Sequence, residues 1–183
     1  MIIETIVTTL NEAGEANVAP MGVTIGEGVI VIRPYTDSAT CRNLIATGVA
    51  VVNLTDSVRV FAESAISHPQ FPTFPAESVQ GRVLTDACSY YECSVIDTET
   101  TTPRATFRCA IVKKGVLREF VGFNRAKNAI IEAAILATRV RLLGTESILQ
   151  EYRRLADVVR KTGGEQETSA MQYLQEYVER QPR

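Results

Sequence analysis

The sequence predicts a mainly β fold of the α+β class, in which a small antiparallel β-barrel precedes a helical C-terminal part. Runs of β-branched residues, separated by short polar or glycine-containing turns, fill most of residues 1–123. This order is typical of antiparallel hairpins that close on themselves. From residue 124 onward, apolar residues recur at helical spacing. We therefore expect a barrel domain over 1–123 and a helical segment over 124–183 that packs on the barrel or on a partner subunit.

The expected strands follow from composition and from turn signals. Gly26-Glu27-Gly28 predicts a tight hairpin turn, and Lys113-Lys114-Gly115 predicts a second turn. The predicted strands cover residues 2–10, 18–25, 29–33, 49–54, 90–96, 106–112 and 116–121. So many strands without long crossover helices argue against a doubly wound sheet, and the glycine motifs of dinucleotide and nucleotide phosphate loops are missing.

Helices are expected between and after these strands. Asp37 or Ser38 can cap a short helix that ends at Gly48, and Asp56 or Ser57 can cap another that reaches Ala65. Three prolines predict an irregular loop over residues 67–76. In the C-terminal part, an Asn N-cap and glycine breaks divide three helices. These residues are Asn124, Gly144, Gly163 and Gly164.

Composition excludes several classes of function. The formal net charge is -2 and the isoelectric point about 5.6, which argues against a nucleic-acid partner. The sequence has no apolar run long enough for a membrane span and no signal peptide, so we expect a cytoplasmic protein. Four cysteines without a CxxC pair and a single histidine make a metal site improbable. We expect the cysteines to be reduced and partly buried.

Three neighbouring segments carry a possible site: Asn-Val-Ala-Pro-Met-Gly at 17–22, Arg-Pro-Tyr at 33–35, and Ser-Ala-Thr-Cys-Arg-Asn-Leu at 38–44. A fourth, Ala-Thr-Gly-Val-Ala-Val-Val-Asn, follows at 46–53. In this order they resemble the flavin reductase-like, FMN-binding split barrels. The resemblance is closer to the DUF447 group of that superfamily, because Phe-Asn-Arg-Ala-Lys-Asn-Ala at 123–129 enters a helix that ends in Ala-Thr-Arg at 137–139.

The resemblance implies an antiparallel split β-barrel of the FMN-binding type, with a helical C-terminal part. It also implies a homodimer that holds FMN at the subunit interface. The activity implied is a flavin-dependent oxidoreductase, which passes hydride or electrons between a nicotinamide or other donor and an unidentified acceptor. NAD(P)H would then bind transiently over the flavin. The alternatives are a non-catalytic flavin- or haem-binding carrier or sensor, and a structural module that recruits a partner through its C-terminal helices.

The residues suit an FMN phosphate, which needs cations and convergent hydrogen-bond donors. Arg33 lies just before the short helix, whose first turn presents free N–H groups. Ser38 and Thr40 add hydroxyls, and Asn43 lies one turn further on. Asp37 would repel a phosphate, so it must cap the helix facing away or contact the ribityl hydroxyls.

The isoalloxazine ring needs a flat apolar face and a row of donors and acceptors. Small side chains at 19–22 let the backbone approach the ring, and Pro20 has no N–H, so the donor must be Met21 or Gly22. Arg33 or Arg125 could stabilise the anionic reduced flavin. No catalytic residue is assigned. The candidate cofactor-binding residues are Ala19, Pro20, Met21, Gly22, Arg33, Tyr35, Ser38, Thr40, Asn43, Asn53, Asn124 and Arg125.

For two features the sequence leaves two possible roles open. The segment from Asn124 to Lys127 is either an N-capped helix start with solvated basic residues or a second anion clamp. His68, the single histidine, is either an exposed loop residue or part of a lid with Phe71 and Phe74 as apolar cover.

Overall fold

The computed structural model describes residues 1–101 and 103–182, which form two compact units. The barrel unit contains Met1–Thr55 and Gln70–Phe120. The helical unit contains Asp56–Pro69 and the residues from Val121 onward. The helical unit is therefore larger than the C-terminal segment that the sequence predicts, because it also contains helix α2 (Val58–Ile66), which lies between two barrel segments in the sequence.

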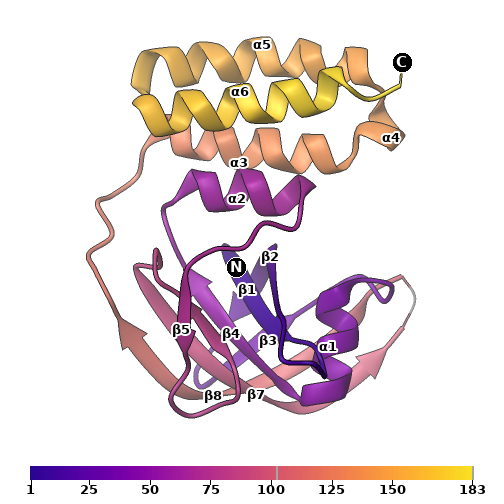
Figure 1. The fold of residues 1–183 in the computed structure, drawn as a ribbon, viewed down its shortest axis with the longest axis vertical. Coiled ribbons are helices and arrows are strands. Elements are labelled where there is room, and N and C mark those ends of the chain that lie inside the picture. The colour runs from indigo at the N-terminus through magenta and orange to yellow at the C-terminus, as the bar shows by residue number, and fades with distance from the viewer. Residues whose placement is uncertain (102, 183) are drawn as a thin grey trace. The chain divides into compact units, whose positions relative to one another are not determined.

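Six antiparallel strands close the barrel in the order β1-β2-β3-β8-β7-β4 (Figure 1). They are β1 (Ile2–Leu10), β2 (Ala16–Ile25), β3 (Val29–Ile32), β4 (Val49–Leu54), β7 (Ser89–Thr100) and β8 (Ala105–Val116). Helix α1 (Ala39–Thr47) contributes Cys41 and Leu44 to the same buried cluster as Phe107 of β8. The mainly β, antiparallel barrel predicted from the sequence is confirmed.

The turn predicted at Lys113-Lys114-Gly115 is wrong, because these residues lie inside β8. Gly115 pairs with Tyr90 of β7, and a Cβ atom at Gly115 would overlap the Tyr90 ring. The glycine therefore makes room for a neighbouring side chain and does not turn the chain. Sequence alone cannot separate these two uses of glycine.

The irregular loop predicted over 67–76 is partly wrong. Strand β5 (Thr73–Pro75) pairs with β6 (Arg82–Leu84) in a separate two-stranded sheet. Phe74 meets the Tyr90 ring edge-on, with 6.2 Å between the ring centroids, and it packs, partly buried, against the small buried cluster of Val51, Val83 and Tyr90. Phe74 therefore packs against the barrel core, and this packing accounts for it without a role as a flavin cover.

The helical unit packs around small residues. Its helices are α2 (Val58–Ile66), α3 (Arg125–Thr138), α4 (Val140–Leu143), α5 (Thr145–Thr162) and α6 (Glu165–Glu179). The buried face of α3 consists mainly of alanines, with Ile130 among them, so neighbouring helices approach closely. Tyr152 of α5, buried among them, donates a hydrogen bond to the carbonyl oxygen of Ala133 at 2.7 Å.

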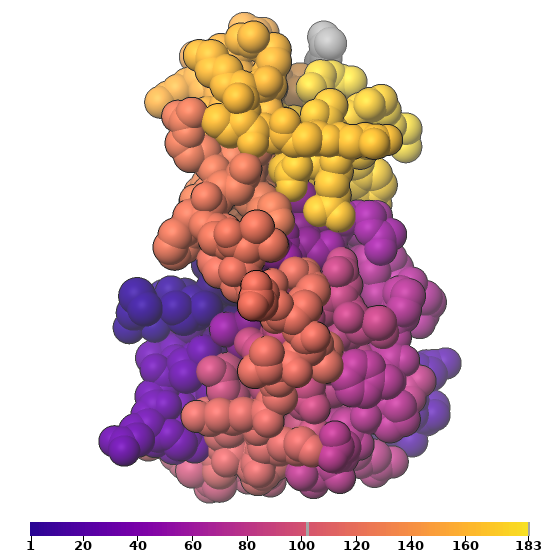
Figure 2. All heavy atoms as spheres, turned by 90° about the vertical axis from the view of Figure 1, so that its left-hand side faces the viewer, coloured from indigo at the N-terminus to yellow at the C-terminus, as the bar shows by residue number. Residues whose placement is uncertain are grey.

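The segment that follows β8 lies at the surface, where Figure 2 shows it in salmon. Val121 and Phe123 in this segment are 87% and 94% exposed, and Val116 at the end of β8 is 81% exposed. These apolar side chains are not part of either core. Among the described residues, no helix combines the length and apolar character needed to cross a bilayer.

All four cysteines are free and buried, as expected from the sequence. Burial raises the pKa of the Cys41 thiol, and it raises the pKa of both Cys93 and Cys109 to about 12. These thiols stay protonated at neutral pH, which argues against a cysteine nucleophile.

Candidate functional site

Although the six strands close the barrel, one edge of β2 is unpaired over most of its length, and we call it the open edge of β2. Strand β2 pairs with β1 from Ala16 to Thr24 but with β3 only at Thr24 and Ile25. The segment 16–23 therefore has, among the described residues, no strand partner on its second side. Sequence segment 17–22, which carries most of the predicted ring-binding residues, lies along this open edge.

Strand alternation decides which backbone groups face the opening. The N–H of Asn11 bonds to Glu15 in the β1–β2 turn, and the N–H of Gly26 bonds to Val29 in the β2–β3 turn. Odd-numbered residues of β2 therefore bond to β1, and even-numbered residues face β3. At the open edge the backbone of Val18, Pro20 and Gly22 faces outward.

Pro20 is tolerated at this edge because its missing N–H would have pointed into the opening and not toward β1. Of the two donors that the sequence left open, the structure favours Gly22. Met21 faces β1, where its carbonyl oxygen also accepts a hydrogen bond from the Thr5 hydroxyl at 2.8 Å. Ala19 faces β1 as well.

Packing within the barrel also requires a glycine at position 22. A Cβ atom there would lie 2.6 Å from Cγ2 of Ile2 and 3.3 Å from a carboxylate oxygen of Glu4. The glycine is therefore explained by packing on β1, whether or not a ligand approaches the edge.

Helix α1 begins close to the start of β2. The Nδ2 of Asn17 donates to the Thr40 hydroxyl at 3.1 Å, and Thr40 is 2% exposed. Ser38, not Asp37, is the N-cap, since its hydroxyl accepts from the N–H of Cys41 and donates to Tyr35. The N–H groups of Ala39 and Thr40 remain as the donors that a helix start offers to an anion.

Guanidinium groups gather around the loop between β3 and α1. Arg33 and Tyr35 are exposed in this loop, and the guanidinium of Arg104 stacks over the Tyr35 ring at 4.1 Å from its centroid. An Nη of Arg104 donates to the carbonyl oxygen of Arg33 at 3.1 Å. An Nη of Arg42 donates to the backbone carbonyl oxygen of Asp37 at 2.6 Å.

Two predicted residues are structural. Asn53 is fully buried; its amide donates to Ile6, Thr8 and Val51, and its Oδ1 accepts from the N–H of Leu84. Asn43 is 6% exposed and donates to the Thr9 hydroxyl at 3.0 Å. Their amides hold the barrel together, so the fold accounts for both side chains without a ligand.

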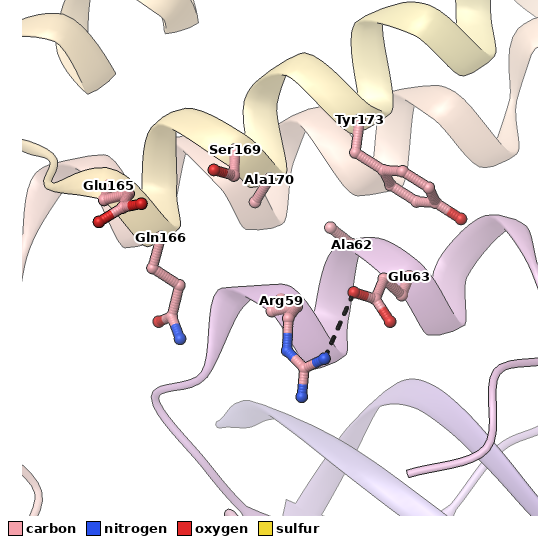
Figure 3. Close-up of a pocket in the computed structure, with 8 residues that line it drawn as sticks. All are labelled: Arg59, Ala62, Glu63, Glu165, Gln166, Ser169, Ala170 and Tyr173. Atoms are coloured by element: carbon pink, nitrogen blue, oxygen red, sulfur yellow. Dashed lines mark ion pairs between the residues drawn. The ribbon is translucent and has the colours of Figure 1, made fainter.

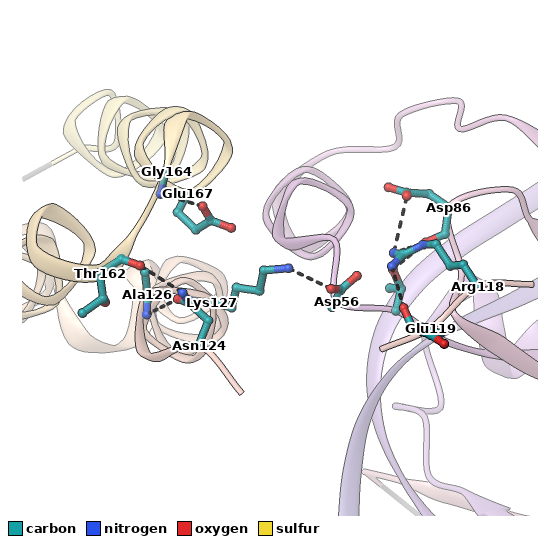
Figure 4. A network of polar contacts seen from close by, with 11 residues as sticks. Asp56, Asp86, Arg118, Glu119, Asn124, Ala126, Lys127, Thr162, Gly164 and Glu167 are labelled. Atoms are coloured by element: carbon teal, nitrogen blue, oxygen red, sulfur yellow. Dashed lines mark hydrogen bonds and ion pairs between the residues drawn. The ribbon is translucent and has the colours of Figure 1, made fainter. Parts of the chain in front are cut away.

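Asn124 caps α3 in the helical unit. Its Oδ1 accepts from the N–H groups of Ala126 and Lys127, and its Nδ2 donates to the carbonyl oxygen of Thr162 (Figure 4). Lys127 forms an ion pair with Asp56 at 2.9 Å. These contacts favour the capping interpretation for Asn124, while Arg125 beside it stays exposed.

A groove of about 600 Å³ lies between α2 and α6 in the helical unit (Figure 3). Arg59 pairs with Glu63 at 3.8 Å across its wall, and Glu165 adds a second carboxylate. Two carboxylates beside one guanidinium oppose a phosphate, and none of the predicted site residues lines this groove. Among the described residues, no cluster of His, Cys, Asp and Glu could hold a metal ion.

Sequence reasoning missed Arg104 and Arg42 as members of the loop cluster. Arg42 stands inside a segment that resembles flavin reductases, so its place on α1 was available from the sequence. Arg104 gives no such signal. It reaches Tyr35 only because β8 pairs with the residues that follow β3, through an isolated bridge between Tyr35 and Arg104.

Two family models match this chain. The N-terminal domain of the protein of unknown function DUF447 matches residues 3–118, and the second model, of the protein of unknown function DUF447, matches residues 124–176. No curated protein matches the chain.

Solved structures share the fold. An FMN-bound DUF447 protein, MM1853 from Methanosarcina mazei, is 25% identical, with a TM-score of 0.83 over 96% of this chain and 94% of that chain. The 2-nitrobenzoate 2-nitroreductase NbaA of Pseudomonas fluorescens is 21% identical, with a TM-score of 0.54 over 62% and 64%. The styrene monooxygenase flavin reductase of Pseudomonas putida S12 is 18% identical, with a TM-score of 0.53 over 62% and 77%. The last two likenesses show the flavin reductase-like barrel fold alone.

Proposed function

Since this chain belongs to the DUF447 family, we propose that it binds FMN in the barrel unit and uses it as a flavin-dependent oxidoreductase. The observation that carries the proposal is the open edge of β2 beside the first turn of α1. It is supported by the similarity, over nearly the whole chain, to a family member crystallised with FMN.

The site offers each part of FMN a suitable partner. The N–H of Gly22 and the carbonyl oxygens of Val18 and Pro20 supply a donor and acceptors for the pyrimidine edge of the ring. The N–H groups of Ala39 and Thr40, together with the Arg33 guanidinium, suit the phosphate. Because the β2 edge is backbone, its hydrogen-bonding groups are fixed in place without side-chain entropy.

Bound FMN would supply the hydride chemistry, so the chain need not provide a nucleophile. The protein's contribution is to orient the ring and to set the charge around it. A guanidinium near the ring stabilises the reduced anion, and Arg33 is the candidate for this role in the barrel unit. We propose a nicotinamide nucleotide as a transient electron donor, in a cytoplasmic protein.

We further propose a homodimer with the flavin at the subunit interface. The open edge of β2 would hydrogen-bond to the pyrimidine edge of the ring, which leaves other parts of the ring for a second copy to contact. Exposed apolar side chains on the barrel unit provide contact area for it. They include Ile45, Ile96, Val112 and Val116.

An absorption spectrum of the purified protein tests the central proposal. We expect the two visible bands of oxidised flavin, either as isolated or after FMN is added to stripped protein. Anaerobic bleaching of these bands by NADH or NADPH supports the oxidoreductase. A protein that binds FMN but is not reduced by either nucleotide is a carrier or uses another donor, and a protein that takes up no FMN contradicts the proposal.

A further inference from the structure

We propose that Arg104, held on the Tyr35 ring, forms with Arg42 a second anion site that binds a phosphate group of the flavin's reaction partner. The inference rests on the proposed function, because it places this phosphate beside the edge assigned to FMN. Neither Arg42 nor Arg104 was among the cofactor-binding residues predicted from the sequence.

Two contacts fix the Arg104 guanidinium. Its Cζ lies 4.1 Å from the centroid of the Tyr35 ring, and one Nη donates to the carbonyl oxygen of Arg33 at 3.1 Å. A guanidinium has five N–H donors, so most of them remain for a ligand. Because these two contacts already restrict the guanidinium, it loses little further conformational entropy when it binds an anion.

The position of Arg104 follows from strand alternation. The N–H of Ala105 bonds to the carbonyl oxygen of Pro34, in register with the pairing of Ile32 and Phe107. The even-numbered residues from Ile32 to Pro34 therefore face β8, and the backbone of Arg33 faces β2. Because Arg104 bonds to that carbonyl oxygen, its guanidinium lies at the opening between β2 and β3.

The charges of this cluster are not balanced by acids. Among the described residues, no carboxylate forms an ion pair with Arg33, Arg42 or Arg104. Elsewhere in the barrel unit, Arg118 pairs with Asp86, and Lys113 with Glu77. Asp37 is the acidic residue of the loop itself; Arg42 contacts its backbone carbonyl.

The number of cations points to the class of ligand. One FMN phosphate is served by Arg33 and the first turn of α1, which leaves Arg42 and Arg104 for another anion. Two guanidinium groups match a phosphate dianion better than a single carboxylate. A planar partner also has the exposed Tyr35 ring, 52% accessible, beside this site.

The test uses the FMN-loaded full chain and inorganic pyrophosphate as the probe, with binding followed by calorimetry. FMN occupancy is read separately from the flavin absorbance. Arg104→Gln should weaken pyrophosphate binding at least about tenfold, the change expected for a lost charge-assisted contact, and leave the FMN Kd unchanged. Lys114→Gln is the matched control, because Lys114 lies over the Tyr91 ring of the same unit at 5.6 Å and should bind the probe as the wild type does.

Three results would overturn the inference. FMN-loaded wild type that does not bind pyrophosphate has no second site. Equal losses of FMN and pyrophosphate affinity in Arg104→Gln would place Arg104 in the cofactor site. Tighter binding of succinate than of pyrophosphate would reject phosphate as the ligand class. Failure of the wild type to take up FMN would instead contradict the proposed function.

Discussion

The carboxylate of Glu92, fully buried on β7, accepts a hydrogen bond from the backbone N–H of Ser78 at 2.5 Å. The N–H groups of Glu77 and Val79 donate to the same carboxylate at 3.0 and 3.1 Å. One buried side chain therefore ties the β5–β6 loop to the barrel wall. Three donors offset the loss of solvation of the carboxylate.

Glu92→Gln should lower the free energy of unfolding by about 1.5–3 kcal/mol, because a carboxamide offers these donors one acceptor oxygen and no charge. Urea denaturation measures the change, and hydrogen exchange at Ser78 locates it. Glu77→Gln is the control, since its ion pair with Lys113 lies at the surface, where ion pairs contribute little to stability. Equal, small effects in both variants would show that the loop does not depend on Glu92.

Gly115→Ala should destabilise the barrel by about 1–3 kcal/mol, because the added methyl group overlaps the Tyr90 ring. Gly26→Ala provides a comparison within the same unit. A Cβ atom at Gly26 meets nothing closer than the Val29 carbonyl oxygen at 3.6 Å. Thermal unfolding of both variants tests the steric explanation, and identical midpoints would refute it.

Stability should fall as pH rises above 9. The unfolded chain releases the protons of Cys93 and Cys109 near the ordinary pKa of 9.0, whereas the folded protein holds them up to about 12. Burial is the main cause of both raised pKa values. The stabilisation is complete below pH 9 and is lost progressively toward pH 12, by up to about 1.4 kcal/mol per thiol per pH unit.

The contribution of Cys109 to this pH dependence is isolated by comparing the wild type with Cys109→Ala. The free energy of unfolding of each is measured from pH 8 to 11. The variant loses a buried side chain, so its stability is lower throughout, but its decline with pH should be shallower. Parallel declines would remove Cys109 as the cause.

Asn124→Ala should cost about 1 kcal/mol of stability, since it removes the cap of α3 and the bond to Thr162. Asn124→Asp keeps the acceptor and should recover part of the loss. FMN affinity should stay unchanged in both, and Arg125→Ala should leave stability unchanged. A large loss of FMN affinity in a stably folded Asn124→Ala would restore the anion-clamp interpretation.

The features that were predictable from sequence are local. The Gly26-Glu27-Gly28 turn, the caps at Ser38 and Asn124, and the buried faces of α5 and α6 each depend on residues within one or two turns of each other. The order of strands and helices follows from them. Pro20 also points to an unpaired strand edge, because proline is tolerated in a strand only where no N–H is needed.

Features that depend on register were not predictable. Whether Gly115 turns the chain or faces Tyr90 is decided by which residue of β7 lies opposite. Arg104 reaches Tyr35 across a large sequence separation, and Asn53 contacts β1 and β6 at once. A polar residue in a suggestive motif can be a ligand or a buried structural group, and only tertiary contacts separate the two.

The most direct test of the account is the affinity of the stripped wild-type protein for FMN and for riboflavin, measured side by side by fluorescence titration. We expect FMN to bind at least about tenfold more tightly, because only FMN carries the phosphate assigned to Arg33 and the first turn of α1. Equal affinities would contradict the phosphate site. Binding of neither flavin would contradict the account as a whole.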